Sequence, residues 1–163
     1  MKPTIIIYNA GPLFNEADRK QRSLEESLMI TSLMNNGYSE NSYEIYNPAT
    51  TEINFEVGNP TPADIFKNDY DAIKETTHFF FDLSTMDEGT HEELGFALAK
   101  LMDGYDVKIY PVISDSRVNA KDKSEFTVPK GWNQFVIGSL LNNGITIYRS
   151  FEEALKAFEN DIQ

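Results

Sequence analysis

Several carboxylates stand close together at the start of an apolar helical stretch, in the segment Asp87–Ala99. They follow the run His78–Phe81, which is typical of a buried strand in a parallel sheet. In open α/β folds, ligands bind outside the carboxyl ends of the parallel strands. The position of these acids therefore favours chemistry on a bound small molecule over a merely solvated surface.

Glu93 is the first candidate for a catalytic group. Helical spacing places it on one face with Ala97 and Leu101, so its carboxylate points towards apolar packing. Burial would raise its pKa, whereas the helix N-terminus would favour its anion, and a carboxylate balanced in this way can act as a nucleophile or a base. The alternative is a first-turn glutamate that only complements the helix dipole. Glu92 lies roughly 100° further around the helix and is expected to face solvent.

Two loops near this helix could supply further contacts to a ligand. Asp87 precedes Gly89, whose flexibility allows close approach, so Asp87 could bind a substrate or could simply cap the helix. At the end of the first predicted strand, Tyr8 is followed by Ala10, which leaves room, and by Gly11, which permits close approach of a ligand. The Tyr8 hydroxyl could orient a carboxylate, although a tyrosine there is also typical of packing. The chain has no glycine-rich phosphate-binding motif.

Asp69 falls inside a predicted helix, where aspartate is unfavourable. Such a residue needs a hydrogen-bond partner or exposure to solvent, and exposure is the default expectation for Asp69 and for its neighbour Asp71. His78 and His91 have no serine or cysteine motif around them, and we expect both to be structural or exposed.

The elements that must position these residues alternate along the chain. Strands are expected at Thr4–Asn9, Tyr43–Tyr46, Thr77–Phe81, Val107–Ile113 and Ile145–Tyr148. Helices are expected at about 15–35, 62–75, 90–102, 132–141 and 151–161. This alternation predicts an α/β fold with a five-stranded parallel sheet covered by helices on both faces.

Two longer loops remain between these elements, Pro48–Pro60 and Ser114–Lys130. Loops of this length are often lids or interface segments, and the pocket shape would depend on them. The stretch Asp115–Lys123 is polar enough to be mobile.

Composition narrows the class of protein. A length of 163 residues fits a single domain, 1–163. The absence of cysteine excludes disulfides and thiol catalysis, and with two separated histidines it argues against a metal. The net charge of −12 would repel nucleic acid, so a neutral or cationic small molecule is the better partner. The apolar run Ile5–Tyr8 is too short for a signal peptide or a membrane span, so we expect a cytoplasmic protein.

Three segments, taken in order, resemble the nucleoside 2-deoxyribosyltransferase family. They are Tyr8-x-Ala-Gly-Pro12, Asn68-Asp69 and Asp87-x-Gly-Thr-x-x-Glu93-Leu-Gly-x-Ala97. The resemblance implies a flavodoxin-like three-layer αβα sandwich with five parallel strands and requires no cofactor. It places the nucleophile at Glu93 and the tyrosine that positions the nucleophile at Tyr8. It places the two aspartates that contact and help protonate the nucleobase at Asp69 and Asp87.

The implied reaction exchanges the nucleobase of a 2′-deoxyribonucleoside, an activity of nucleoside and nucleotide salvage. The glutamate attacks the anomeric carbon, the base leaves, and a second free base captures the deoxyribosyl-enzyme, so that two displacements retain the configuration. Family members are usually homo-oligomers, commonly hexamers built from dimers, in which a neighbouring subunit lends an asparagine to the sugar 5′-hydroxyl. Asn133 is the candidate for that asparagine, although it could instead start a helix. We expect 2′-deoxyribose to be preferred over ribose.

Two other functions stay open. A nucleoside or nucleotide N-glycosidase of the same superfamily would use the same glutamate but would give the sugar to water. Relatives that act on deoxynucleoside monophosphates resemble this chain in the glutamate segment but carry a first loop rich in glycine, serine and arginine. The loop Asn9–Asn15 contains no arginine, which favours a free nucleoside. A non-enzymatic flavodoxin-like binding module would use its acids only to solvate the surface.

Overall fold

Four short runs rich in isoleucine, phenylalanine and tyrosine form the parallel sheet of the computed structural model, which describes residues 5–51, 59–115 and 132–163. The strands are β1 (Ile5–Ala10), β2 (Tyr43–Tyr46), β3 (His78–Asp82) and β4 (Lys108–Val112). They lie in the order β2-β1-β3-β4, and every neighbouring pair is parallel. From β1 the chain adds β2 on one side and then adds β3 and β4 on the other, so the strand order changes direction between β1 and β3. A ligand is therefore expected near the carboxyl ends of these two strands.

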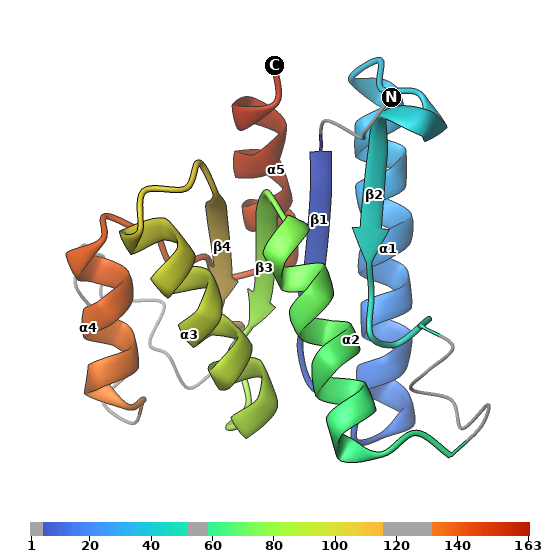
Figure 1. The fold of residues 1–163 in the computed structure, drawn as a ribbon. Helices are drawn as coiled ribbons and strands as arrows, with labels where there is room; N and C mark the ends of the chain where they lie inside the picture. Colours follow the sequence, from blue (N-terminus) through green and yellow to red (C-terminus); the bar gives the residue numbers. More distant parts are fainter. Residues whose placement is uncertain (1–4, 52–58, 116–131) are drawn as a thin grey trace.

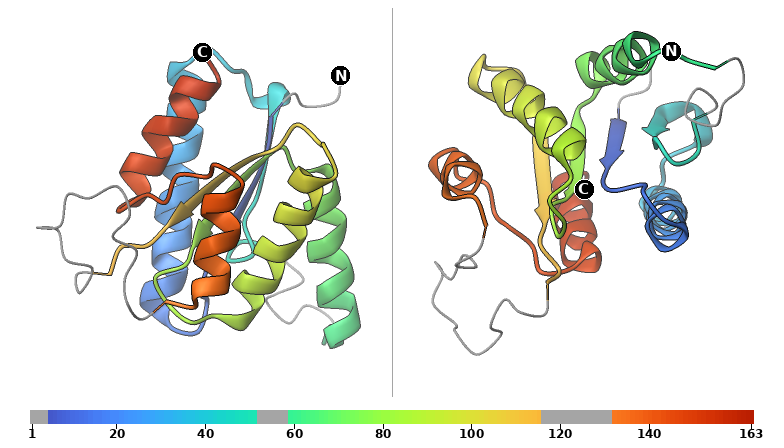
Figure 2. Two further views of the ribbon diagram at one scale, coloured as in Figure 1. Left: turned by 90° about the vertical axis from the view of Figure 1, so that its left-hand side faces the viewer. Right: turned by 90° about the horizontal axis from the view of Figure 1, so that it is seen from below.

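Helices cover both faces of this sheet (Figure 1, Figure 2). They are α1 (Glu16–Asn35), α2 (Pro62–Glu75), α3 (Glu88–Met102), α4 (Gln134–Asn142) and α5 (Phe151–Asp161), with a short 3-10 helix, η1 (Glu40–Ser42), before β2. Side chains alternate along the strands, so Tyr8 and Phe79 pack against α2, α3 and α4, whereas Ile7 and Phe80 pack against α1 and α5. The three-layer arrangement is confirmed.

The prediction of a fifth strand is wrong. The segment Ile145–Tyr148 makes a single parallel bridge between Tyr148 and Val112, so the sheet of the described residues has four strands. Tyr148 donates to the carbonyl of Pro111 at 2.8 Å and accepts from Ile113 at 2.9 Å. The next bond of a parallel ladder would run from the nitrogen of Pro111 to this segment, and proline has no N–H to donate. The ladder therefore stops after one bridge.

Capping residues set where the helices at the carboxyl edge of the sheet begin. Thr61 caps α2, and the helix begins at Pro62, as predicted. Helix α3 begins two residues before the predicted Thr90, because Asp87 caps it, and α4 begins after Asn133, which caps it in the same way. Helices α2 and α3 therefore start beside each other at the edge where β1 and β3 end (Figure 1).

Part of each long loop, 52–58 and 116–131, lies outside the described residues, so the lid prediction for Pro48–Pro60 and Ser114–Lys130 is not addressed by the structure. The same holds for most of the polar stretch Asp115–Lys123 and for Thr4. Within the described ranges, no helix combines the length and the apolarity needed to cross a lipid bilayer.

Candidate active site

The centre of the site is a contact between Glu93 and Tyr8, which are 85 positions apart in the chain. Tyr8 lies in β1 and is fully buried, and Glu93 lies in the second turn of α3 and is half-buried. The apolar face predicted for α3 is present, since Leu94, Ala97 and Leu98 are buried against the sheet. The Tyr8 hydroxyl donates a hydrogen bond of 2.6 Å to Glu93 Oε1. This contact fixes one carboxylate oxygen and leaves Oε2 outside it.

The surroundings of this pair set the protonation of both groups. Burial raises the pKa of Glu93, the hydrogen bond from Tyr8 lowers it, and the negative charges of Asp69 and Asp87 raise it, so that together they bring it to about 8. Burial and the charge of Glu93 also raise the pKa of Tyr8, so Tyr8 remains a hydrogen-bond donor. A carboxylate with a raised pKa beside a cavity is a candidate for a nucleophile or a base.

Asp69 lies beside this pair, on α2, and is half-buried rather than exposed. Its Oδ1 accepts a short hydrogen bond from the hydroxyl of Tyr46, and the same hydroxyl accepts from Asn68 Nδ2. Burial raises the pKa of Asp69, and the hydrogen bond from Tyr46 lowers it. The neighbouring Asp71 instead pairs on the surface with lysines of the same helix. Asp69 is an aspartate inside a helix, and Tyr46 is the hydrogen-bond partner that such a residue needs when it is not exposed.

Tyr46 is a site residue that the sequence reasoning missed. It ends β2 and lies opposite Tyr8 in the sheet, and the two rings stack with their centroids 5.0 Å apart and 19° between their planes. A signal was present in the sequence, because Tyr46 ends one predicted strand and Tyr8 lies next to the end of another, so both are placed towards the carboxyl edge of one parallel sheet.

A cavity of about 120 Å³ opens between α2 and α3 next to these groups. Its lining combines aromatic side chains and carboxylates, namely Phe66, Asp69, Tyr70, Ile73, Gly89, Glu92, Glu93 and Phe96. Glu92 is exposed at its rim, as predicted, and Gly89 places backbone against it. None of these eight described residues is basic. The cavity therefore suits a neutral or cationic ring with polar edges and disfavours an anion.

Asp87 acts as the cap of α3 in the structure. Its Oδ1 accepts from the backbone N–H of Gly89 at 3.1 Å, and its Oδ2 accepts from the Thr90 hydroxyl at 2.6 Å. Both oxygens thus have partners inside the helix start, and Asp87 acts on Glu93 through its charge. Contact between Asp87 and a substrate stays a prediction.

Three further predicted contact residues lie away from the cavity. Ala10 is fully buried in the core, and its carbonyl accepts from Arg22 Nη1 at 3.1 Å. Gly11 lies against the same guanidinium, because a Cβ there would stand 1.8 Å from Arg22 Nη1. Asn133 caps α4 by accepting from the backbone N–H groups of Phe135 and Val136. The structure brings Tyr8, Asp69, Gly89 and Glu93 together, with Asp87 at their edge.

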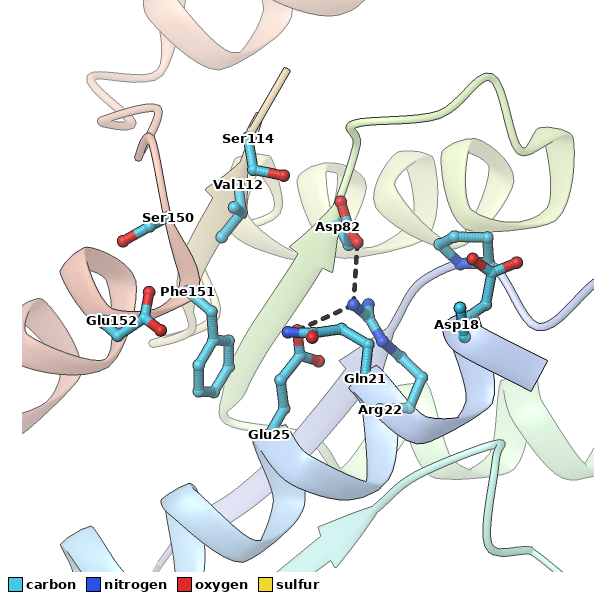
Figure 3. A pocket seen from close by; sticks show the side chains of 12 residues that line it. Asp18, Gln21, Arg22, Glu25, Asp82, Val112, Ser114, Ser150, Phe151 and Glu152 are labelled. Atoms are coloured by element: carbon cyan, nitrogen blue, oxygen red, sulfur yellow. Dashed lines mark hydrogen bonds and ion pairs between the residues drawn. The ribbon is translucent and has the colours of Figure 1, made fainter. Parts of the chain in front are cut away.

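Arg22 occupies the crevice between β1 and β3 on the opposite face of the sheet (Figure 3). It is 1% exposed, and its Nη2 lies 2.8 Å from both Glu25 and Asp82, the acid that ends β3. A cavity of about 390 Å³ adjoins this cluster, between the N-terminal turns of α1 and the first turn of α5. Asp82 follows the predicted strand Thr77–Phe81, and its partner is Arg22. The ion pair with Asp82 and the hydrogen bond to the Ala10 carbonyl together join α1 to the ends of β3 and β1.

Together the fold and the site define an open parallel α/β protein with a carboxylate-centred site for a small molecule. Residues 7–130 match the family model described as nucleoside 2-deoxyribosyltransferase, and the chain belongs to this family. The resemblance seen in the sequence is therefore confirmed.

Three individual proteins are similar to this chain. The uncharacterized protein UU063 of Ureaplasma parvum serovar 3 is 32% identical over 148 residues, which span 88% of this chain and 87% of that protein. A conserved protein from Enterococcus faecalis V583, known from its crystal structure, has a TM-score of 0.73 at 21% identity and covers 96% of this chain and 98% of its own. The CMP N-glycosidase BcmB of Clostridium botulinum has a TM-score of 0.55 at 19% identity, with the same coverage. These two structures show the shared fold.

Proposed function

We propose that this protein is a nucleoside 2-deoxyribosyltransferase that exchanges the nucleobase of 2′-deoxyribonucleosides. The observation that supports the proposal most directly is the Tyr8–Glu93 hydrogen bond at the carboxyl edge of the sheet, with Asp69 beside it. A carboxylate held in this way suits the formation of a covalent glycosyl intermediate through an oxocarbenium-like transition state.

The residues divide the work as follows. Ionised Glu93 attacks the anomeric carbon, the bond from that carbon to the base nitrogen breaks, and its electron pair leaves with the base. Asp69 supplies the proton that the departing base takes up, because burial favours its protonated form. The nitrogen of a second base then attacks the same carbon, the ester bond to Glu93 breaks, and the carboxylate is restored. The proton that the second base loses from its attacking nitrogen returns to Asp69.

The charges around the cavity favour a free nucleoside over a nucleotide. Its lining carries three carboxylates and no described basic residue. Arg22 is neutralised by Glu25 and Asp82, and Arg19 donates to the carbonyl of Leu13. A 5′-phosphate would meet repulsion here. BcmB, by its name, acts on the nucleotide CMP, and we propose that this chain differs in that preference.

We also propose that the protein works as a homo-oligomer in which Asn133 of one subunit reaches the sugar bound by another. The cap of α4 uses Asn133 Oδ1, so Nδ2 is the atom that would donate to the 5′-hydroxyl. Light scattering at the concentrations used for kinetics is expected to give a mass above that of the 18.5 kDa chain.

The ionisation of Glu93 predicts the pH dependence of kcat/KM. With an aryl 2-deoxyriboside, whose leaving group needs no proton, the rate is expected to rise with pH through about 8, because Glu93 must be ionised. With a nucleoside, the reacting state has Glu93 ionised and one proton on Asp69. The pH profile is therefore bell-shaped and falls above about pH 8, where Glu93 and Asp69 together lose this proton.

In the variant Tyr8→Phe, two limbs are expected to move to higher pH. They are the rising limb of the profile with the aryl donor and the falling limb of the profile with the nucleoside, both near pH 8 in the wild type. The phenol hydrogen bond lowers the pKa of Glu93, and its loss leaves the opposing effects of burial and of the nearby acids. Initial rates between pH 5 and 10 measure the shift. Limbs that stay in place in Tyr8→Phe would contradict the assignment of this ionisation to Glu93.

The experiment that tests the proposed function is product analysis by chromatography. The protein is incubated with 2′-deoxyinosine and adenine, or with thymidine and adenine, and each donor is also run without adenine. Formation of 2′-deoxyadenosine supports the proposal, and the productive donor shows whether pyrimidines are accepted. Free deoxyribose in place of exchange would identify a hydrolase. No turnover of either donor would favour a binding protein.

A further inference from the structure

The hydroxyl of Tyr46 links the two halves of the candidate site. It lies between Asn68 Nδ2 and Asp69 Oδ1, and its ring stacks on Tyr8, the residue that holds Glu93. An amide nitrogen can only donate, so the hydrogen bond from Asn68 uses a lone pair of the Tyr46 oxygen. The proton of Tyr46 must then point at Asp69. The three groups form a chain with a single direction of donation.

Packing alone does not account for this hydroxyl. A phenylalanine at position 46 would stack on Tyr8 equally well, since the stack needs only the ring. The residue is half-buried, and its hydroxyl is hydrogen-bonded to two neighbouring side chains of α2, those of Asn68 and Asp69. It therefore fixes where the Asp69 carboxyl stands relative to the end of β2. The ring contact in turn fixes β2 relative to Tyr8 and Glu93.

We propose that Tyr46 is a positioning residue for the reaction, which holds the Asp69 carboxyl in the place from which it protonates the departing base. The inference rests on the proposed function. Tyr46 does not touch the reacting atoms in this account, but acts through Asp69 and is separate from the Tyr8–Glu93 contact.

The ionisation of Asp69 gives a direct readout. Burial raises the pKa of Asp69 and the Tyr46 hydrogen bond lowers it, so the variant Tyr46→Phe is expected to raise that pKa. Carbon NMR titration of the side-chain carboxyls measures this without any substrate. Tyr43→Phe is the matched control, because it makes the same change at the other end of β2. An Asp69 titration that is the same in Tyr46→Phe and in the wild type would overturn the proposal.

Kinetics with two donors separate a positioning role from a structural one. With 2′-deoxyinosine and adenine, Tyr46→Phe is expected to lose about tenfold or more in kcat/KM, as part of the contribution of a general acid. The acidic limb of its pH profile is expected to move to higher pH, following Asp69. With the 4-nitrophenyl 2-deoxyriboside, which needs no proton, the rate is expected to stay within about twofold of the wild type.

The outcomes distinguish the two claims. Equal losses with both donors would show that Tyr46 supports only the structure around Glu93, which would overturn the positioning role. If the wild type exchanges no base and releases none, the proposed function fails. The NMR titration still decides whether Tyr46 controls Asp69, and an unchanged titration would refute that link by itself.

Discussion

Replacing Glu93 by glutamine is expected to abolish base exchange, with a loss of about 10⁴-fold or more in kcat, the scale seen when a covalent nucleophile is removed. The amide keeps the shape of the side chain and can still accept the hydrogen bond from Tyr8. It cannot form the ester to the anomeric carbon. Because burial disfavours the ionised carboxylate, the neutral amide is also expected to leave the fold intact.

Two measurements check this expectation. Rates of 2′-deoxyadenosine formation give the loss, and intact mass after a rapid quench without acceptor detects the deoxyribosyl-enzyme in the wild type alone. Glu88→Gln is the matched control, since it makes the same change on an exposed residue at the start of α3. Exchange at the wild-type rate in Glu93→Gln would rule out the covalent role.

Replacing Gly11 by alanine is expected to destabilise the fold by about 3 kcal/mol or more. The new Cβ would stand 1.8 Å from Arg22 Nη1 and 2.7 Å from Cζ, so the guanidinium must leave its place. A flexible side chain could normally move aside at low cost. Here it is buried and ion-paired, and its departure leaves Glu25 buried without its partner, which is the expensive way to break a buried ion pair.

Urea unfolding, followed by the fluorescence of Trp132, measures the change in the free energy of unfolding. Gly138→Ala is the control of opposite sign, because open space surrounds that glycine in α4 and alanine favours a helix by about 1 kcal/mol. In an Arg22→Met background the cost of Gly11→Ala should shrink, since the clash is with the guanidinium. An undiminished cost there would contradict this explanation.

Local patterns in the sequence were sufficient for the five helices, for four of the five predicted strands and for the candidate nucleophile. Capping signals and apolar spacing predicted α2 and the apolar face of α3, and thereby the position of Glu93. The family resemblance added Tyr8 and Asp69, which the structure brings beside it. These features depend on residues within one element or on short motifs.

The missed features depend on contacts between distant segments. Tyr46 meets Asp69 only after β2 is placed beside β1, and Arg22 looks like one more charged residue on a polar helix until α1 packs on the crevice. The fifth strand failed for a different reason. Its composition favoured a strand, but pairing depends on the donors of the neighbour, and Pro111 withholds one of them.

Pro111 also affects whether a second copy of the chain can pair with the edge of the sheet. An edge strand with a full row of outward N–H and C=O groups is a template on which a second chain can add, and this is how many proteins aggregate. Pro111 interrupts that row on β4, while β2 offers only four residues at the other edge and exposes the charge of Glu44. Extension of the sheet from copy to copy is therefore disfavoured at both edges. Stable assembly of this protein is expected to use the outer surfaces of its helices.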